Sequence, residues 1–140
     1  MAGIVVGIDG SPESQKALTF AVNEARVRGD RLRAISVWQY APSLLIDHDT
    51  GFDVHDKDRV AEAQTAAQAE LDIVLAGATV PATELLVCEG DPAHVLIEES
   101  REAEMLVVGS RGRGSLAGTL LGSVSQNCAS HAQCPVTVVR

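Results

Sequence analysis

The sequence contains few aromatic residues and little positive charge. Its 140 residues include one Trp, one Tyr and two Phe, and 19 Asp and Glu outnumber 11 Lys and Arg, which gives a formal net charge of −8. A nucleic acid would be repelled by that negative field, and so few aromatic rings cannot stack a series of bases. The composition therefore argues against nucleic-acid binding.

Signals for membrane insertion, secretion and disulfide formation are missing as well. No apolar run approaches the ~20 residues that a membrane helix needs, and residues 1–7 lack the basic start and cleavage site of a signal peptide. Cys88, Cys128 and Cys134 form no CxxC pair, so they indicate neither a disulfide framework nor a zinc cluster. We expect these cysteines to be small buried apolar residues, and the protein to be soluble and cytoplasmic.

Three motifs of common nucleotide-binding and hydrolase families do not account for this chain. The loop G-x-x-x-x-G-K-[ST] is absent, because the only lysines, Lys16 and Lys57, lie in other contexts. The G-x-S-x-G turn of α/β-hydrolases is absent too. Residues 112–117 match the dinucleotide pattern G-x-G-x-x-G/A, but they come late in the chain and no acidic residue follows to hold a ribose. We therefore do not expect NAD as the ligand.

The charges that are present are unevenly distributed. All 19 acidic residues lie within 9–104, and residues 105–140 carry Arg111, Arg113 and Arg140 but no acid. An acid-free stretch in an acidic protein is a place where an anion could dock. Core and interface segments also need few charges, so charge alone leaves both interpretations open.

Short apolar runs alternate with segments of helical periodicity. Ser11 and Asp91 are N-cap residue types, and each is followed by a proline, which is favoured at the first helical position. The expected strands are 3–8, 32–37, 83–88, 105–108 and 136–139. The helices expected between them run from Pro12 to Gly29, over 60–77, from Pro92 through Ile97, and from about Ser123 to Ala132. This alternation predicts one α/β domain over 1–140, with a parallel sheet and helices on both faces.

Residues 38–56 differ in composition from the rest and are expected to form a surface loop. Carboxylates and imidazoles are metal ligands, and the candidate donors here are Asp47, His48, Asp49, Asp53, His55 and Asp56. Their spacing is uneven and includes no i,i+4 His pair. A solvated acidic loop is the interpretation we favour, and we assign no metal site.

Two of the expected strands are followed by unusual loops. Asp9-Gly10-Ser11 follows the first strand, and a loop with glycines at 109, 112, 114, 118 and 122 follows the fourth. Ligands of open α/β sheets bind outside the carboxyl ends of the strands, where the strand order reverses. Glycines let backbone N–H groups converge on phosphate oxygens, and the helix that begins at Gly122-Ser123 favours an anion at its start. If the two strands are neighbours, these loops border one anion site.

Each candidate residue also has a structural interpretation. Asp9 could cap the helix that begins near Ser11, although Ser11 itself is available for that role. The hydroxyls of Ser123 and Ser125 could donate to a ligand or cap the last helix. The arginines of the loop are equally suited to clamp phosphates and to be solvated.

The spaced glycines resemble a known signature. Gly109-x2-Gly112-x9-Gly122-Ser123 has the form G-x2-G-x9-G-[ST], which is the ATP-binding signature of universal stress proteins. Residues 4–11 resemble the first strand and turn of that family, and residues 131–140 resemble its closing strand. From 38 to 80 the chain is similar to the family only in the order of its elements. A branch of the family that does not bind ATP lacks these glycines, so this chain resembles the binding branch.

The resemblance implies a fold, a ligand and an assembly. The fold would be Rossmann-like, of the adenine nucleotide alpha hydrolase-like kind, with a five-stranded parallel sheet in the order 3-2-1-4-5. The ligand would be ATP with Mg²⁺ or Mn²⁺ bound through the phosphates, and two chains would form a homodimer through Val136–Val139. The residues that would contact the nucleotide are Gly7 and Asp9 beside the adenosine, Val37 at the adenine, Val108 and Gly109 at the sugar and phosphates, Gly112, Gly122, Ser123, Val124 and Ser125 at the triphosphate, and Arg111 as a candidate clamp.

The function implied is that of an ATP-binding regulator in a stress response. No nucleophile is paired with a His and no general base is evident, so we assign no catalytic residue and expect at most weak ATPase activity. A slow ATP hydrolase and an interaction module with a vestigial nucleotide site are the alternatives.

Overall fold

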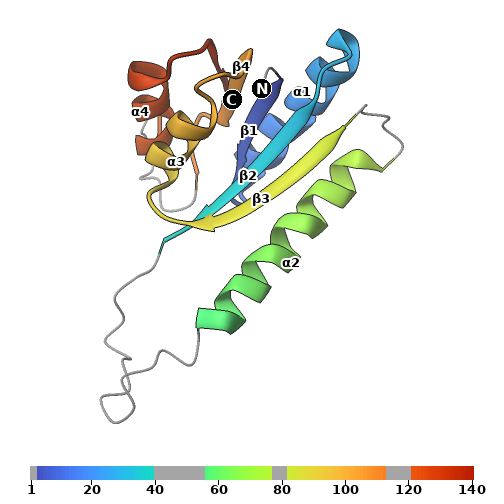
Figure 1. Cartoon of the computed structure of the whole chain (residues 1–140), viewed down its shortest axis with the longest axis vertical. Coiled ribbons are helices and arrows are strands. Elements are labelled where there is room, and N and C mark those ends of the chain that lie inside the picture. Colours follow the sequence, from blue (N-terminus) through green and yellow to red (C-terminus); the bar gives the residue numbers. More distant parts are fainter. Residues whose placement is uncertain (1–2, 40–55, 77–81, 113–120) are drawn as a thin grey trace.

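The computed structural model describes residues 3–39, 56–76, 82–112 and 121–140. In this part of the chain, five parallel strands form one sheet in the order β3-β2-β1-β4-β5 (Figure 1). The strands are β1 (Ile4–Ile8), β2 (Leu32–Trp38), β3 (Thr83–Glu89), β4 (Met105–Gly109) and β5 (Val136–Val139). This order confirms the fold class expected from the sequence.

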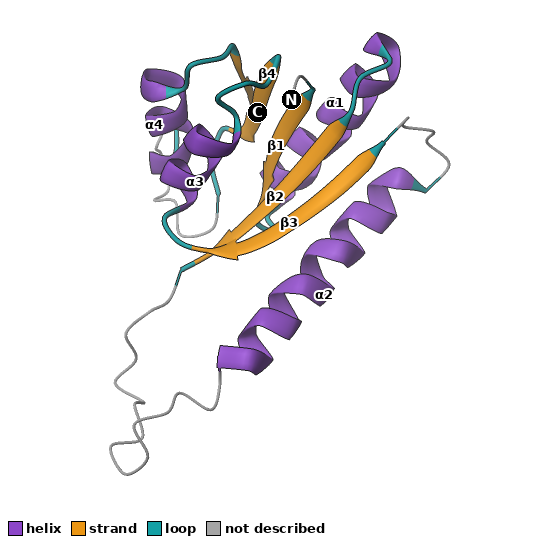
Figure 2. Ribbon diagram, in the orientation of Figure 1, coloured by secondary structure: helices purple, strands orange, loops and turns teal. Residues whose placement is uncertain are grey.

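Helices cover both faces of the sheet. They are α1 (Pro12–Arg28), α2 (Asp56–Leu75), α3 (Pro92–Glu99) and α4 (Ser123–His131). α1 and α2 pack on one face, and α3 and α4 on the other (Figure 2). Side chains of β1 alternate between the two cores, because Ile4 and Val6 pack with α1 and α2 whereas Val5 packs with Leu96 and Cys128. A strand buried on both faces has to be apolar almost throughout, which explains its continuous apolar sequence.

Local signals fix the ends of α1 and the start of α3. Ser11 Oγ accepts a hydrogen bond from the Ser14 N–H (3.1 Å), and Gly29 ends α1 in the left-handed conformation, with φ 69°. The Asp91 carboxylate accepts a hydrogen bond from the His94 N–H (3.0 Å) at the start of α3. These caps satisfy amides that have no partner inside the helix, and they are the caps expected from the sequence.

Some boundaries differ from the expected ones. α2 begins at Asp56, whereas the sequence predicted a helix only from Val60. The first turn of the helix is polar, so it contributes nothing to the apolar periodicity. β2 and β3 each continue one residue further than expected, since Trp38 pairs with Glu89. The candidate metal donors of 40–55, together with Arg113 and the glycines at 114 and 118, lie outside the described residues.

The cysteines are buried to different degrees. Cys128 is completely buried in α4, and burial raises the pKa of its thiol to about 11, so the thiol stays protonated at neutral pH. Cys88 and Cys134 are half-buried. The expectation of small buried residues is therefore correct for Cys128 and only partly correct for the other two.

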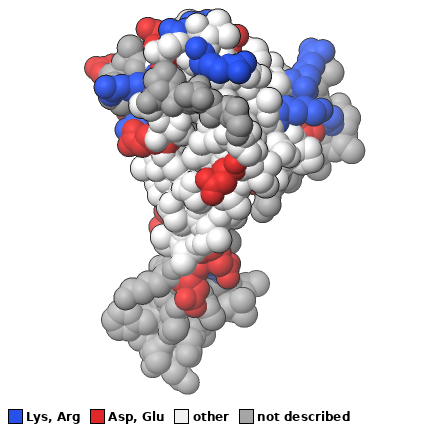
Figure 3. Space-filling model, turned by 90° about the vertical axis from the view of Figure 1, so that its right-hand side faces the viewer, with Lys and Arg blue, Asp and Glu red and all other residues white. Residues whose placement is uncertain are grey.

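The surface adds two observations. None of the described helices is both long enough and apolar enough to cross a membrane. On the face drawn in Figure 3, Lys and Arg side chains gather at the upper end of the molecule, where the strands begin. Among the residues described on this face, the end toward which the strands run carries no comparable basic patch.

Candidate functional site

The carboxyl ends of β1, β2 and β4 open into a cavity of about 480 Å³. A volume of this size suits a small organic ligand. The cavity is lined by every residue that was assigned to a nucleotide from the sequence: Gly7, Asp9, Val37, Val108, Gly109, Arg111, Gly112, Gly122, Ser123, Val124 and Ser125. The fold therefore brings these residues together, and their contacts with a ligand stay a prediction.

The cavity lies where the strand order reverses. β1 is the central strand, and Ile4 pairs both with Leu32 of β2 and with Met105 of β4. The loops that follow β1 and β4 therefore leave the sheet as neighbours. Ligand crevices of open α/β sheets form at this point, so the topology agrees with the placement expected from the two loop sequences.

Three helices begin at this cavity, and they are capped differently. Side chains satisfy the first amides of α1 and α3, through Ser11 Oγ and the Asp91 carboxylate. The N-cap of α4 is Gly122, and none of the side chains that the structure describes caps this helix. Within the described residues, the N–H groups of Ser123 and Val124 have no acceptor. The amides and dipole at the start of α4 are therefore available to an anion.

Hydrogen bonds hold the start of α4 against the end of β4. The Gly122 N–H donates to the Ser110 carbonyl (2.6 Å), and Ser125 Oγ donates to the same carbonyl (2.9 Å). The Ser110 N–H in turn donates to the carbonyl of Val139 in β5 (2.7 Å). Ser125 is buried and its hydroxyl also bonds the Gly122 carbonyl. A ligand contact of Ser125 would therefore come from its backbone amide and not from its hydroxyl.

Close packing explains the glycines at two of the predicted positions. A Cβ at Gly7 would lie 2.8 Å from Leu96 Cδ1 of α3, and a Cβ at Gly109 would lie 3.0 Å from the backbone carbon of Glu13 in α1. Both distances are too short for an ordinary contact between carbon atoms. At these positions the absence of a side chain lets a helix approach the sheet.

Asp9 lies between the helix cap and the cavity: Ser11 caps α1, and Asp9 in turn binds Ser11. Its Oδ1 accepts hydrogen bonds from the N–H (2.9 Å) and Oγ (2.5 Å) of Ser11, so it shapes the turn that leads into α1. Its Oδ2 lies toward the glycine loop, where a Cβ at Gly112 would come within 2.5 Å of it. The carboxylate lines the cavity while it holds the turn.

The wall of the cavity extends beyond the residues that the sequence assigned to the site. Val37, Trp38 and Gln39 lie at the end of β2, as the predicted role of Val37 requires, and α2 contributes Ala63, Ala66, Ala67 and Glu70. In the sequence, the small residues of α2 fit an ordinary core-facing helix, so no local signal marked them. Asp91, Ser14 and Asn127 also line the cavity and were missed.

Arg111 is exposed and borders the cavity. Among the described residues it forms no ion pair. Its position fits a phosphate clamp as well as a solvated loop residue, so both interpretations remain open.

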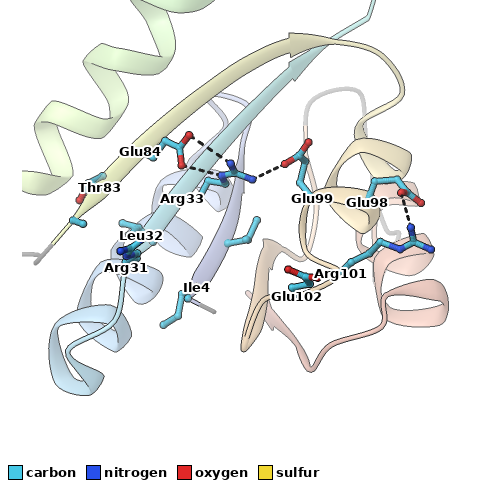
Figure 4. A pocket seen from close by; sticks show the side chains of 13 residues that line it. Ile4, Arg31, Leu32, Arg33, Thr83, Glu84, Glu98, Glu99, Arg101 and Glu102 are labelled. Carbon is cyan, nitrogen blue, oxygen red and sulfur yellow. Dashed lines mark hydrogen bonds and ion pairs between the residues drawn. The ribbon is translucent and has the colours of Figure 1, made fainter. Parts of the chain in front are cut away.

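A second cavity, of about 570 Å³, lies at the opposite edge of the sheet, where the strands begin (Figure 4). Arg33 forms ion pairs there with Glu84 (3.1 Å) and Glu99. These partners raise the pKa of the Arg33 guanidinium, and the hydrogen bond to Glu84 contributes most to that rise. Arg101 pairs with Glu98 (3.4 Å). These charges satisfy one another and brace β2, β3 and α3. The smaller cavity at the carboxyl edge is therefore the better candidate for a ligand site.

Comparison with known protein families shows to which family the chain belongs. The sequence profile of the Universal stress protein family matches residues 2–140. The chain belongs to the universal stress protein family.

Related sequences agree with that assignment. A universal stress protein of Mycobacterium tuberculosis is 38% identical over 144 residues, which cover 99% of this chain and 45% of the relative. A universal stress protein of Mycolicibacterium smegmatis is 37% identical, over 98% of this chain and 45% of the relative. The chain thus spans about half the length of the curated relatives it matches.

Solved structures of universal stress proteins share the fold. The protein from Lactobacillus plantarum superimposes with a TM-score of 0.83 at 26% identity, over 98% of this chain and 96% of that one. A universal stress protein solved in complex with cAMP is 30% identical, with a TM-score of 0.61, over 100% of this chain and 96% of that one.

Proposed function

We propose that this universal stress protein binds an adenine nucleotide, ATP with Mg²⁺ or Mn²⁺, in the carboxyl-edge cavity, and that the bound state regulates a stress response. The observation that carries the proposal is the uncapped start of α4, anchored beside the end of β4. Phosphate oxygens are natural acceptors for such amides. The 30% identical neighbour in complex with cAMP supports an adenine nucleotide as the class of ligand.

The lining of the cavity suggests how the nucleotide would lie. The amides of Ser123 and Val124 would take the phosphates, with the charge of Arg111 at the rim. Val37, at the end of β2, would meet the adenine. Asp9, at the end of β1, would lie beside the ribose. This arrangement places the negative end of the ligand at the positive end of a helix dipole.

The metal ion would arrive with the nucleotide. Within the described residues, no group of three or more His, Cys, Asp or Glu side chains could hold a metal ion. Mg²⁺ in nucleotide sites is usually bound by phosphates, waters and one or two carboxylates, and not by an all-protein cage. The ion would also offset part of the triphosphate charge in a chain with a net charge of −8.

Binding without efficient hydrolysis is the activity that the cavity supports best. Its carboxylates at Asp9 and Glu70 both accept hydrogen bonds from the turn between β1 and α1, which engages them in holding that turn. A general base would instead have to orient and deprotonate an attacking water. Slow ATP hydrolysis remains the alternative, and phosphate release from bound ATP would reveal it.

Ser123→Asp tests the proposed anion site directly. A carboxylate in the first turn of α4 interacts favourably with the helix dipole, by about 0.3–1 kcal/mol, so the helix should be retained. The same charge would repel the phosphates. We expect the variant to bind Mg-ATP about 100-fold more weakly than the wild type in isothermal titration calorimetry.

Ser130→Asp is the matched control, because it places the same charge at an exposed position near the other end of α4. Its affinity for Mg-ATP should equal that of the wild type. Equal binding by Ser123→Asp and the wild type would contradict the proposed site. A wild-type protein that binds no adenine nucleotide at millimolar concentration would favour the vestigial-site alternative.

A further inference from the structure

Glu70 connects α2 to the turn between β1 and α1. Its Oε2 accepts a hydrogen bond from the Gly10 N–H (3.1 Å), and its Oε1 accepts one from Ser14 Oγ (2.8 Å). Both donors lie more than fifty residues away in the sequence. The carboxylate therefore closes one side of the cavity that Glu70, Gly10 and Ser14 line together.

The hydrogen bonds continue from Glu70 to Asp9. Ser14 is buried, and its Oγ accepts a hydrogen bond from the Asp9 N–H (2.9 Å) while it donates to Glu70. Glu70 thus holds the amide of Gly10 directly and the amide of Asp9 through Ser14. Gly10 has φ 80°, a left-handed conformation that glycine adopts without strain in a tight turn. Two held amides at this turn fix the direction in which the Asp9 side chain leaves the backbone.

The Glu70 carboxylate also fixes the position of α2, which forms one wall of the cavity. α2 contacts the core through the apolar side chains of Ala67 and Leu71, and Ala63, Ala66 and Ala67 face the cavity. Apolar packing is not directional, whereas the hydrogen bonds of Glu70 fix one geometry. The turn that carries Asp9 and the wall that α2 supplies are therefore held in one arrangement by one side chain.

We propose that Glu70 is a positioning residue of the nucleotide site, which holds the Asp9 turn and the α2 wall in the arrangement that receives the ligand. The proposal rests on the proposed function. Glu70 acts through Ser14 and Gly10, so removal of either partner in the Glu70–Ser14 bond should disturb the same turn. This dependence separates a positioning role from a general contribution of α2 to stability.

Affinity for Mg-ATP tests the proposal in five variants. Glu70→Ala and Ser14→Ala should each weaken binding about tenfold, because each variant removes the charge-assisted Glu70–Ser14 bond. The double variant should lose less affinity than the sum of the two single losses, because the Glu70–Ser14 bond is removed by both changes and can be lost only once. Glu62→Ala is the control, since it removes an exposed carboxylate from the same helix and should leave the affinity unchanged. Glu70→Gln keeps an acceptor oxygen and should recover part of the loss.

Hydrogen exchange of the ligand-free proteins provides a readout that needs no nucleotide. The Gly10 amide should exchange faster in Glu70→Ala than in the wild type and in Glu62→Ala. Wild-type affinity in Glu70→Ala, or additive losses in the double variant, would overturn the role of Glu70 while leaving the proposed function intact. An absence of nucleotide binding by the wild-type protein would overturn the proposed function and this proposal together.

Discussion

Glycines at the carboxyl edge of the sheet serve two different purposes. Gly7 and Gly109 lack a side chain because Leu96 and the backbone of Glu13 lie too close for one. Gly122 begins a helix whose first amides are capped by no side chain in the described part of the chain. Gly109 belongs to the signature as much as Gly122 does, so packing between α1 and β4 accounts for part of this signature.

Gly7→Ala tests the packing role at the residue scale. The added methyl group would push Leu96 out of a well-packed core, and overpacking of this kind costs about 1–3 kcal/mol. Thermal or urea unfolding should show that loss. In a Leu96→Val background the side chain is shorter by one methylene and lacks the Cδ1 atom that the new methyl group would meet, so the additional cost of Gly7→Ala should fall.

The opposite pattern would assign Gly7 to the ligand. That pattern would be unchanged unfolding of Gly7→Ala together with a large loss of Mg-ATP affinity.

Individual hydrogen bonds around the cavity could not be predicted from the sequence. Ser123 and Ser125 are equivalent candidates in the sequence, because both are serines at the start of a helix. In the structure Ser125 is buried and bonds the Ser110 carbonyl, whereas Ser123 is exposed at the cavity. The difference comes from which side of α4 each residue occupies relative to β4, and that depends on how the helix packs.

At the scale of elements, helix ends were predictable where their signals are local. Ser11 and Asp91 each cap the helix that a following proline begins, and the amide that each one satisfies lies three residues further on. The start of α2 was less predictable. Its first turn lacks apolar residues, so periodicity detected the helix only from Val60 onward.

The contribution of α2 to the cavity could not be predicted from its own sequence. Ala63, Ala66, Ala67 and Glu70 lie at i, i+3, i+4 and i+7, which places them on one face of a helix. That spacing is typical of any helix that packs on a sheet. Only the position of α2 beside the end of β1 turns this face into a cavity wall with a carboxylate on the turn of Gly10.

At the scale of the whole molecule, the strand order determines where the site lies. β1 stands between β2 and β4, so loops distant in the sequence border one cavity. The two glycine-containing loops signalled this arrangement in the sequence, because each follows an expected buried strand. The cavity at the amino edge had no such signal, since no motif marks its residues, and Arg33 and Arg101 pair there with neighbouring glutamates.

β5 is the last strand of the described sheet, which fits the homodimer expected from the sequence. The N–H groups of Leu106 and Ser110 donate to the carbonyls of Pro135 and Val139, so the backbone of Val138 points away from β4. Val138→Pro would remove an outward amide without breaking the β4–β5 ladder, and edge strands tolerate proline at such positions. Sedimentation should show a dimer for the wild type and a monomer for this variant.

Val138→Thr keeps the amide and is the control for the dimer. It should sediment as the wild type does. A wild-type monomer, or a dimer that persists in a folded Val138→Pro variant, would contradict pairing through β5.

The most direct test of the proposed nucleotide site follows the backbone amides of the wild-type protein by ¹H–¹⁵N NMR during titration with Mg-ATP. The account predicts that the largest downfield shifts occur at Ser123 and Val124, whose N–H groups have no acceptor among the described residues. The Gly10 amide, which Glu70 already holds, should shift less. Saturable shifts that leave Ser123 and Val124 unaffected would contradict the claim that the start of α4 binds phosphate.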